Sequence, residues 1–162
     1  MAVVTTIPKE KAKAFTHKLT KALSSNHSLN KVDMIDHLNR QLMGWAAFYK
    51  FTDFTARTFQ KIDRIVFWKL AHWMAHKHRC RVKSLMRKWV RAPEAGKAKT
   101  WIVGGISEQG NRVVREMRRL VGSPKGQFRW KNPEINPYVK KIEPRSTITS
   151  RYHDVAMAMG QA

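Results

Sequence analysis

The sequence predicts a mainly α-helical protein, in which a bundle of three to four helices precedes a small irregular C-terminal part that holds a short hairpin. Apolar residues recur at steps of three and four within residues 8–92, which is the spacing of one helix face. From Pro93 onward this periodicity weakens, and glycine and proline interrupt the chain at short intervals. We therefore expect a helical domain over residues 8–92 and an irregular basic extension over residues 93–162.

The first helix is expected over residues 9–23. Pro8 precedes it, at a position where the missing N–H of proline costs little. Its apolar stripe consists of Ala12, Phe15, Leu19, Ala22 and Leu23. Lysines occupy the remaining surface, so this helix would present positive charge to solvent.

A second helix is expected over residues 30–51, with Ser28 or Asn30 as its N-cap. Its apolar stripe consists of Ile35, Leu38, Leu42, Trp45 and Tyr49. Gly44 lies inside this helix, where glycine costs about 1 kcal/mol relative to alanine. A close crossing of another helix over Gly44 would explain that cost.

A third helix is expected over residues 56–76, after a short break at residues 52–55. Its apolar stripe consists of Phe59, Ile62, Val66, Leu70 and Trp73. Phe67 and Met74 widen the stripe, so this helix is expected to be buried on more than one side. A shorter fourth helix ends before Pro93, and its inward residues are Val82, Leu85, Met86 and Trp89.

The extension is expected to contain two strands and one short helix. Residues 100–103 would form the first strand, and residues 112–121 a helix closed by Gly122. Residues 127–130 would form the second strand, which completes the predicted hairpin.

The balance of charge indicates a polyanionic partner. The chain of 162 residues has 32 Lys and Arg against 11 Asp and Glu, a formal net charge of +21. Self-repulsion of this size opposes a compact fold unless a polyanion supplies counter-charge, and contacts to phosphates would then carry most of the affinity. A merely soluble basic surface is the plain alternative. A membrane surface is disfavoured, because no helix sets a clean apolar face opposite an all-basic one.

The residue types that build catalytic or metal centres do not come together in this sequence. Cys80 is the only cysteine, so no intramolecular disulfide is expected. Asp33 and Asp36 lie in the first turn of a helix, where acids usually serve the helix dipole. His72 and His76 have the spacing of a metal pair but lack a clear third ligand. We expect no catalytic centre, metal or cofactor. We also expect a cytoplasmic protein, since no signal core and no run of 18 apolar residues occurs.

The tryptophans divide into two groups. Trp45 and Trp73 fall on apolar stripes, so they are expected in the core. Trp68, Trp101 and Trp130 are less constrained, and we predict them as candidates for stacking on unpaired bases. Such stacking is worth about 1–3 kcal/mol per base.

Two sequence elements in the helical part match a known family. The first runs from His37 to Tyr49 and contains Leu38-Asn39, then Gly44-Trp45, then Phe48-Tyr49. The second is Phe59-Gln60-Lys61-Ile62-Asp63-Arg64, at a fitting spacing. In this order, residues 14–90 resemble the maturase-specific domain of group II intron reverse transcriptases, also called the thumb or domain X. Asn136-Pro137-Tyr138 is similar to a tripeptide found near the C-termini of these proteins.

The resemblance implies a thumb-like helical bundle that grips group II intron RNA and helps it reach its splicing-active fold. In the family this domain also lies along the template–primer duplex during reverse transcription. The sequence departs from the family in having no finger or palm region, no Tyr-x-Asp-Asp polymerase centre and no cysteine-rich nuclease domain. Polymerase activity of this chain alone is therefore not expected. Such a chain would be a truncated remnant, a separately encoded half or an excised piece.

Residue roles follow from the charge and from the family motif together. We predict phosphate contacts for six cations of the second and third helices, which are Arg40, Lys50, Arg57, Lys61, Arg64 and Lys69. A structural role is predicted for Leu38, Asn39, Gly44, Trp45, Tyr49, Phe59 and Asp63. Asp63 is expected either to pair with a cation of the second helix or to face solvent.

Four hypotheses about function remain open at this point. The first is a binding module for group II intron RNA that assists splicing. The second is the thumb of a split reverse transcriptase, active only with a separate palm subunit and acting on a DNA target. The third is a nonfunctional remnant, and the fourth is a general helical DNA-binding protein.

Overall fold

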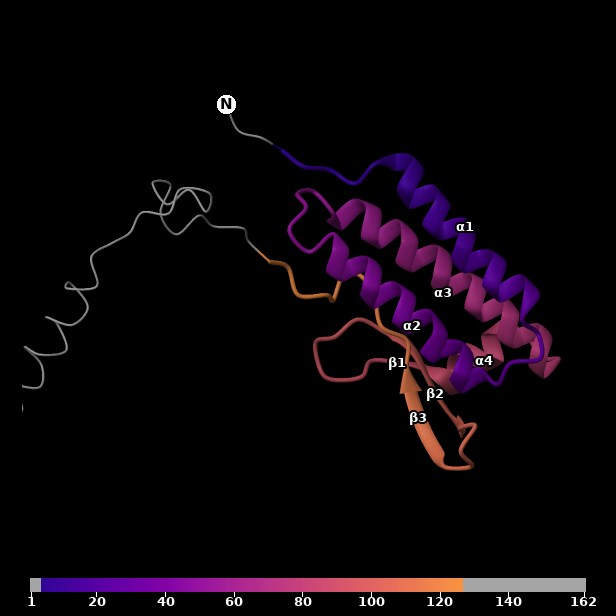
Figure 1. Ribbon diagram of the computed structural model, residues 1–162. Helices are drawn as coiled ribbons and strands as arrows, with labels where there is room; N and C mark the ends of the chain where they lie inside the picture. The colour runs from indigo at the N-terminus through magenta and orange to yellow at the C-terminus, as the bar shows by residue number, and fades with distance from the viewer. Residues whose placement is uncertain (1–3, 127–162) are drawn as a thin grey trace, which may run out of the picture. The chain divides into compact units, whose positions relative to one another are not determined.

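The computed structural model describes residues 4–126, which form four helices and a three-stranded sheet (Figure 1). The elements in chain order are α1 (Lys9–Ser25), α2 (Lys31–Phe48), α3 (Ala56–His78), α4 (Val82–Trp89), β1 (Val90–Arg91), β2 (Thr100–Ile106) and β3 (Arg112–Glu116). This architecture confirms the predicted mainly α fold with a small C-terminal part.

The helices bury the apolar stripes that the sequence predicts. The short connections at residues 26–30 and 49–55 fold α1, α2 and α3 back on one another, and the three lie with their long axes side by side (Figure 1). Between α1 and α2, the rings of Phe15 and Trp45 stack with centroids 4.6 Å apart. The main buried side chains of the bundle are Leu19, Leu23, Ile35, Leu38, Leu42, Phe59, Ile62, Val66, Leu70 and Trp73.

The sheet is antiparallel, in the order β1-β2-β3, and it packs against the helices through β2. The register pairs Val90 with Trp101 and Val103 with Arg115. Trp101 and Val103 are fully buried, and the indole N–H of Trp101 donates to the Phe67 carbonyl of α3 at 3.2 Å. The prediction that Trp101 is free to stack on a base is therefore wrong.

The predicted helix at residues 112–121 is also wrong. Residues 112–116 form β3 instead, which pairs with β2 from Ile106 to Ile102, and residues 117–121 are not helical. Paired β-branched valines at positions 113 and 114 favour a strand. The two strands join through a tight turn in which Gly110 takes a φ of 80°. The predicted strand at residues 127–130 lies outside the described residues.

Gly44 does not mark a close helix crossing. No heavy atom lies within 4 Å of the position that a Cβ would take there, and the residue is exposed. The expected crossing is therefore wrong. The second helix also ends at Phe48 rather than at residue 51.

The extension and the helices share one core over the part of the chain that the structure describes. Trp101, Val103, Met117 and Leu120 belong to the same buried cluster as the helical stripes. The proposed division at residue 92 stays a prediction. The described residues that follow it contribute side chains to the core of the bundle.

The contact between β2 and α2 is tight at Gly105, which generates a testable prediction. A Cβ at this position would lie 2.6 Å from Cγ2 of buried Val32. We expect Gly105→Ala to lower the free energy of unfolding by about 1–3 kcal/mol, because the strand must move off the helix. Urea denaturation followed by circular dichroism measures this loss.

The neighbouring residue provides a matched control. At Gly104 the nearest atom to an added Cβ is 3.9 Å away, which is an ordinary contact. Gly104→Ala is expected to leave stability nearly unchanged. Equal stability of the two variants would contradict the close approach of β2 to α2.

Candidate nucleic-acid interface

Three of the six predicted phosphate-contacting cations share one face of α3. Arg57, Lys61 and Arg64 are spaced by four and three residues, so their side chains align along the helix, and all three are exposed. Trp68 continues the same row four residues later. We call this row, Arg57, Lys61, Arg64 and Trp68, the basic face of α3.

The other three predicted cations are exposed but lie elsewhere. Lys69 is on α3, but roughly a third of a turn away from the basic face. Arg40 is on α2 and Lys50 is in the turn that follows α2. The structure thus gathers half of the predicted set.

No acid neutralises the basic face within residues 4–126. The two salt bridges among the described residues join Lys97 to Glu94 and Arg115 to Asp36. Cations that lack acidic partners on a folded protein are available to a polyanion.

Trp68 exposes its ring on this face. Its side chain is 45% exposed, and its ring meets that of Phe67 edge-on, with centroids 5.6 Å apart and an angle of 83° between the planes. Trp73 is buried and Trp45 is packed against the core, as the stripes predict. Trp130 lies outside the described residues, so Trp68 is the predicted stacking candidate that the structure presents to solvent.

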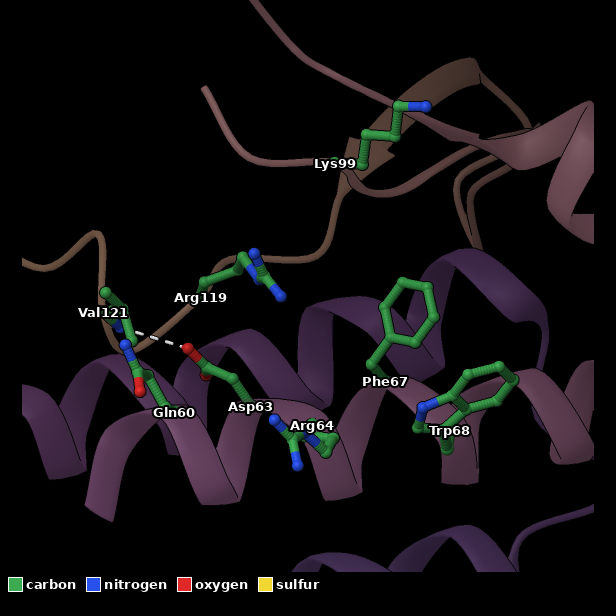
Figure 2. A pocket seen from close by; sticks show the side chains of 8 residues that line it. All are labelled: Gln60, Asp63, Arg64, Phe67, Trp68, Lys99, Arg119 and Val121. Atoms are coloured by element: carbon green, nitrogen blue, oxygen red, sulfur yellow. Dashed lines mark hydrogen bonds between the residues drawn. The ribbon is translucent and has the colours of Figure 1, made fainter. Parts of the chain in front are cut away.

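A pocket of about 530 Å³ opens beside the basic face (Figure 2). One wall is α3, which contributes Gln60, Asp63, Arg64, Phe67 and Trp68. The other wall is formed by the chain around the sheet, which contributes Lys99, Arg119 and Val121. Figure 2 shows the α3 side chains in a row and the Arg119 side chain reaching toward them from the opposite segment.

Asp63 joins the two walls of this pocket. Its carboxylate accepts hydrogen bonds from the backbone N–H groups of Leu120, at 2.8 Å, and Val121, at 3.1 Å, and it is buried. Burial raises the pKa of this carboxyl group, although the two N–H donors and nearby Arg119 oppose the rise. Both expectations for Asp63 are therefore wrong, because it neither faces solvent nor pairs with a cation of the second helix.

Asn39 performs a similar role from α2. Its side-chain oxygen accepts from the N–H of Arg118 and its amide donates to the carbonyl of Glu116, both at 2.8 Å. We call Asn39 and Asp63 together the polar clamp. The clamp holds residues 116–121 in a non-helical conformation and so places Arg119 against α3.

Two cations of the pocket were missed by sequence reasoning. Lys99 and Arg119 precede and follow β2 and β3, and only the closed sheet brings them opposite α3. The Nε atom of Arg119 is buried and has no hydrogen-bond partner among the described residues. Their charge alone could have marked them in the sequence, and it does not distinguish them from the other basic residues.

A second group of cations gathers around Trp89. The ammonium groups of Lys31 and Lys88 lie 4.6 and 5.0 Å from the centroid of this ring. Burial, and then the charge of Lys88, lower the pKa of Lys31. Burial and the neighbouring lysines also lower the pKa of His78. A phosphate placed among these groups would relieve their repulsion.

The structural roles predicted for the remaining motif residues stay predictions, and the structure shows where these side chains lie. Leu38 and Phe59 are buried in the core. Trp45 and Tyr49 are half-buried and meet edge-on, with ring centroids 4.6 Å apart.

Two negative findings apply to residues 4–126. No group of three or more His, Cys, Asp or Glu side chains there could hold a metal ion, and both His72 and His76 are exposed. Within the same range, no helix has both the length and the apolar composition needed to cross a membrane.

Residues 12–89 match the model of one protein family, described as the group II intron, maturase-specific domain, so this part of the chain is similar to that domain. The matched range ends at the last residue of α4, so it includes both residues of the polar clamp but not the segment that they hold. No curated protein matches the chain.

The hydrogen bonds of Asp63 predict the effect of its substitution. Asp63→Asn keeps one acceptor oxygen but turns an NH₂ group toward one of the two backbone N–H donors. We expect the free energy of unfolding to fall by about 1–3 kcal/mol, since a buried donor loses its acceptor. Hydrogen exchange at the Leu120 and Val121 amides is expected to accelerate.

Asp33→Asn is the matched control, because Asp33 is a half-buried acid in the first turn of α2. Its loss should cost only the helix-dipole contribution, about 0.3–1 kcal/mol. If Asp63→Asn is no less stable than Asp33→Asn, Asp63 does not hold the two walls together.

Proposed function

Because the chain carries a group II intron maturase-specific domain over residues 12–89, we propose that it binds group II intron RNA through the basic face of α3 and assists the folding and splicing of that RNA. The matched domain is the maturase-specific one and is not itself catalytic. The role is therefore that of a binding module.

The observation that carries this proposal is the basic face itself. Arg57, Lys61 and Arg64 are aligned, exposed and without acidic partners among the described residues. Structured RNA is recognised mainly by its shape and by its backbone, which a rigid row of cations suits. A rigid helix also keeps the spacing between its cations constant, so RNAs whose phosphates match that spacing bind better than others.

Binding of this kind assists splicing by mass action. A protein that binds the splicing-active RNA fold more tightly than misfolded RNA shifts the population toward the active fold. The size of the shift is set by the difference between the two affinities. No chemical step by the protein is needed.

The test compares a group II intron RNA with an unrelated structured RNA of equal length over a range of salt concentrations. Charge alone would give two affinity curves that fall in parallel as salt rises. We expect the intron RNA to stay bound at salt concentrations that release the control RNA. Coinciding curves would contradict the proposed function for the isolated chain.

The same titration tests the basic face. Arg57→Ala combined with Lys61→Ala is expected to reduce the slope of log affinity against log salt by about 1 for each phosphate that the protein no longer neutralises. Lys97→Ala combined with Lys125→Ala is the matched control, since both lysines are exposed and Lys97 already pairs with Glu94 at 2.8 Å. A slope unchanged by the first pair would remove Arg57 and Lys61 from the interface.

A second candidate function is the thumb of a split reverse transcriptase, and exposed apolar residues favour it. The side chains of Phe48 and Phe54 are 78% and 79% exposed. Next to them, Thr5 and Asp53 exchange hydrogen bonds, which ties the N-terminal segment and its exposed Val4 to the turn between α2 and α3. Large exposed apolar side chains near one turn are candidates for a protein contact, and a separate palm subunit is the partner that this candidate requires.

This candidate is tested by adding a group II intron reverse-transcriptase palm and measuring complex formation and DNA synthesis. We expect Phe48→Ser with Phe54→Ser to weaken the complex roughly tenfold or more while RNA binding persists. The matched control is Ile106→Ser with Val114→Ser, which removes two exposed apolar residues from the sheet. If the palm does not bind, or if both pairs weaken it equally, the second candidate fails.

A further inference from the structure

The pocket beside α3 combines an aromatic surface with unpaired positive charge. Trp68 and Phe67 lie on the α3 wall, and the cations Arg64, Lys99 and Arg119 also line the pocket (Figure 2). Its volume of about 530 Å³ lies within the usual range for small-ligand sites. A ligand that fits this pocket must therefore have both a flat ring and a negative charge.

The charges of the pocket are not satisfied by the protein. The one acid of the lining, Asp63, already accepts two backbone N–H groups, and no salt bridge among the described residues reaches Arg64, Lys99 or Arg119. The buried Nε of Arg119 also lacks a hydrogen-bond partner in this part of the chain. The lining has three cations and one carboxylate, which already accepts hydrogen bonds. This leaves an excess of two positive charges that a negatively charged ligand would neutralise.

The exposed ring of Trp68 is not explained by core packing. Phe67, its neighbour, turns toward the core and meets Trp101, with ring centroids 5.3 Å apart. Trp68 instead remains 45% exposed on the face that carries Arg57, Lys61 and Arg64. An exposed aromatic ring within a row of cations is the arrangement that binds unpaired bases along a nucleic-acid backbone.

We propose that this pocket takes a single unpaired nucleotide of the bound RNA, with its base stacked on Trp68 and its phosphate held by Lys99 and Arg119. The inference rests on the proposed function, and it adds the chemical form of RNA that the surface selects. A base inside a duplex cannot present its flat face to Trp68, so the nucleotide must come from a bulge, a loop or a strand end. Arg64 also lines the pocket and is exposed, so it is available to contact a neighbouring phosphate of the strand.

The basic face and the pocket therefore have different roles in RNA binding. Cations along α3 contact the backbone whatever its sequence, which places the RNA but does not select it. The pocket then raises the affinity for an RNA that has an extruded nucleotide at the right distance from those phosphates. Recognition of a particular intron would depend on this second step.

The test distinguishes the contribution of the bases to binding affinity from the contribution of the phosphates. The full chain is titrated with a single-stranded RNA of about ten nucleotides, and with the same strand lacking its bases, which keeps every phosphate. Stacking of one base predicts that the intact strand binds about five- to a hundredfold more tightly than the abasic strand.

Four variants test whether that preference arises in the pocket. Trp68→Ala is expected to abolish it, and Trp68→Phe to keep part of it. The matched control is Phe48→Ala, which removes a more exposed ring outside the pocket and should leave the preference intact. Lys99→Ala should weaken binding of both strands by the same factor, because it removes a phosphate contact only. Circular dichroism verifies that each variant is folded.

The outcomes are distinct from those of the intron titration. If the wild-type chain binds the intact and abasic strands equally, or if Phe48→Ala reduces the preference as much as Trp68→Ala does, the pocket does not bind a base. If the base preference is present while intron and control RNAs bind alike, the nucleotide site stands and the proposed intron function fails.

Discussion

The arrangement of this protein depends on one buried carboxylate. Asp63, in the middle of α3, accepts hydrogen bonds from two consecutive backbone N–H groups, those of Leu120 and Val121. Residues 117–121 have no strand or helix partner for these donors, so without Asp63 the segment would bury unpaired polar groups. Asn39 completes the same function from α2 by pairing with Glu116 and Arg118.

This polar clamp connects the folded core to the charged surface. By holding residues 116–121 across α2 and α3, it carries the apolar Met117 and Leu120 into the core and leaves Arg119 between α3 and the sheet. A cation that would otherwise lie in an irregular loop is thereby placed opposite Arg64. The pocket is a consequence of how the extension is attached.

The excess of positive charge favours a polyanionic partner, and exposure to solvent limits the repulsion between the cations. Each cation of the basic face points to solvent, where water screens repulsion between neighbours. Where cations come closer, as around Trp89, burial and repulsion already lower the pKa values of Lys31 and His78. Within residues 4–126 the acid buried in the core, Asp63, is already hydrogen-bonded, so the proposed RNA binding would neutralise surface charge without requiring this acid to change partners.

The helices, the charge and the family motif are readable in the amino-acid sequence, because each of these is a local pattern. The apolar stripes from Leu19 to Trp73 repeat at helical spacing, and their burial follows directly from that spacing. Which residues come together around the pocket is visible only in the tertiary structure. Residues 112–116 form a strand and residues 117–121 an irregular segment, Trp101 is buried, and Asp63 holds that segment by hydrogen bonds. In each case the partner lies far away in the chain, as Asp63 and Leu120 do, and no periodicity or spacing encodes a contact between distant residues.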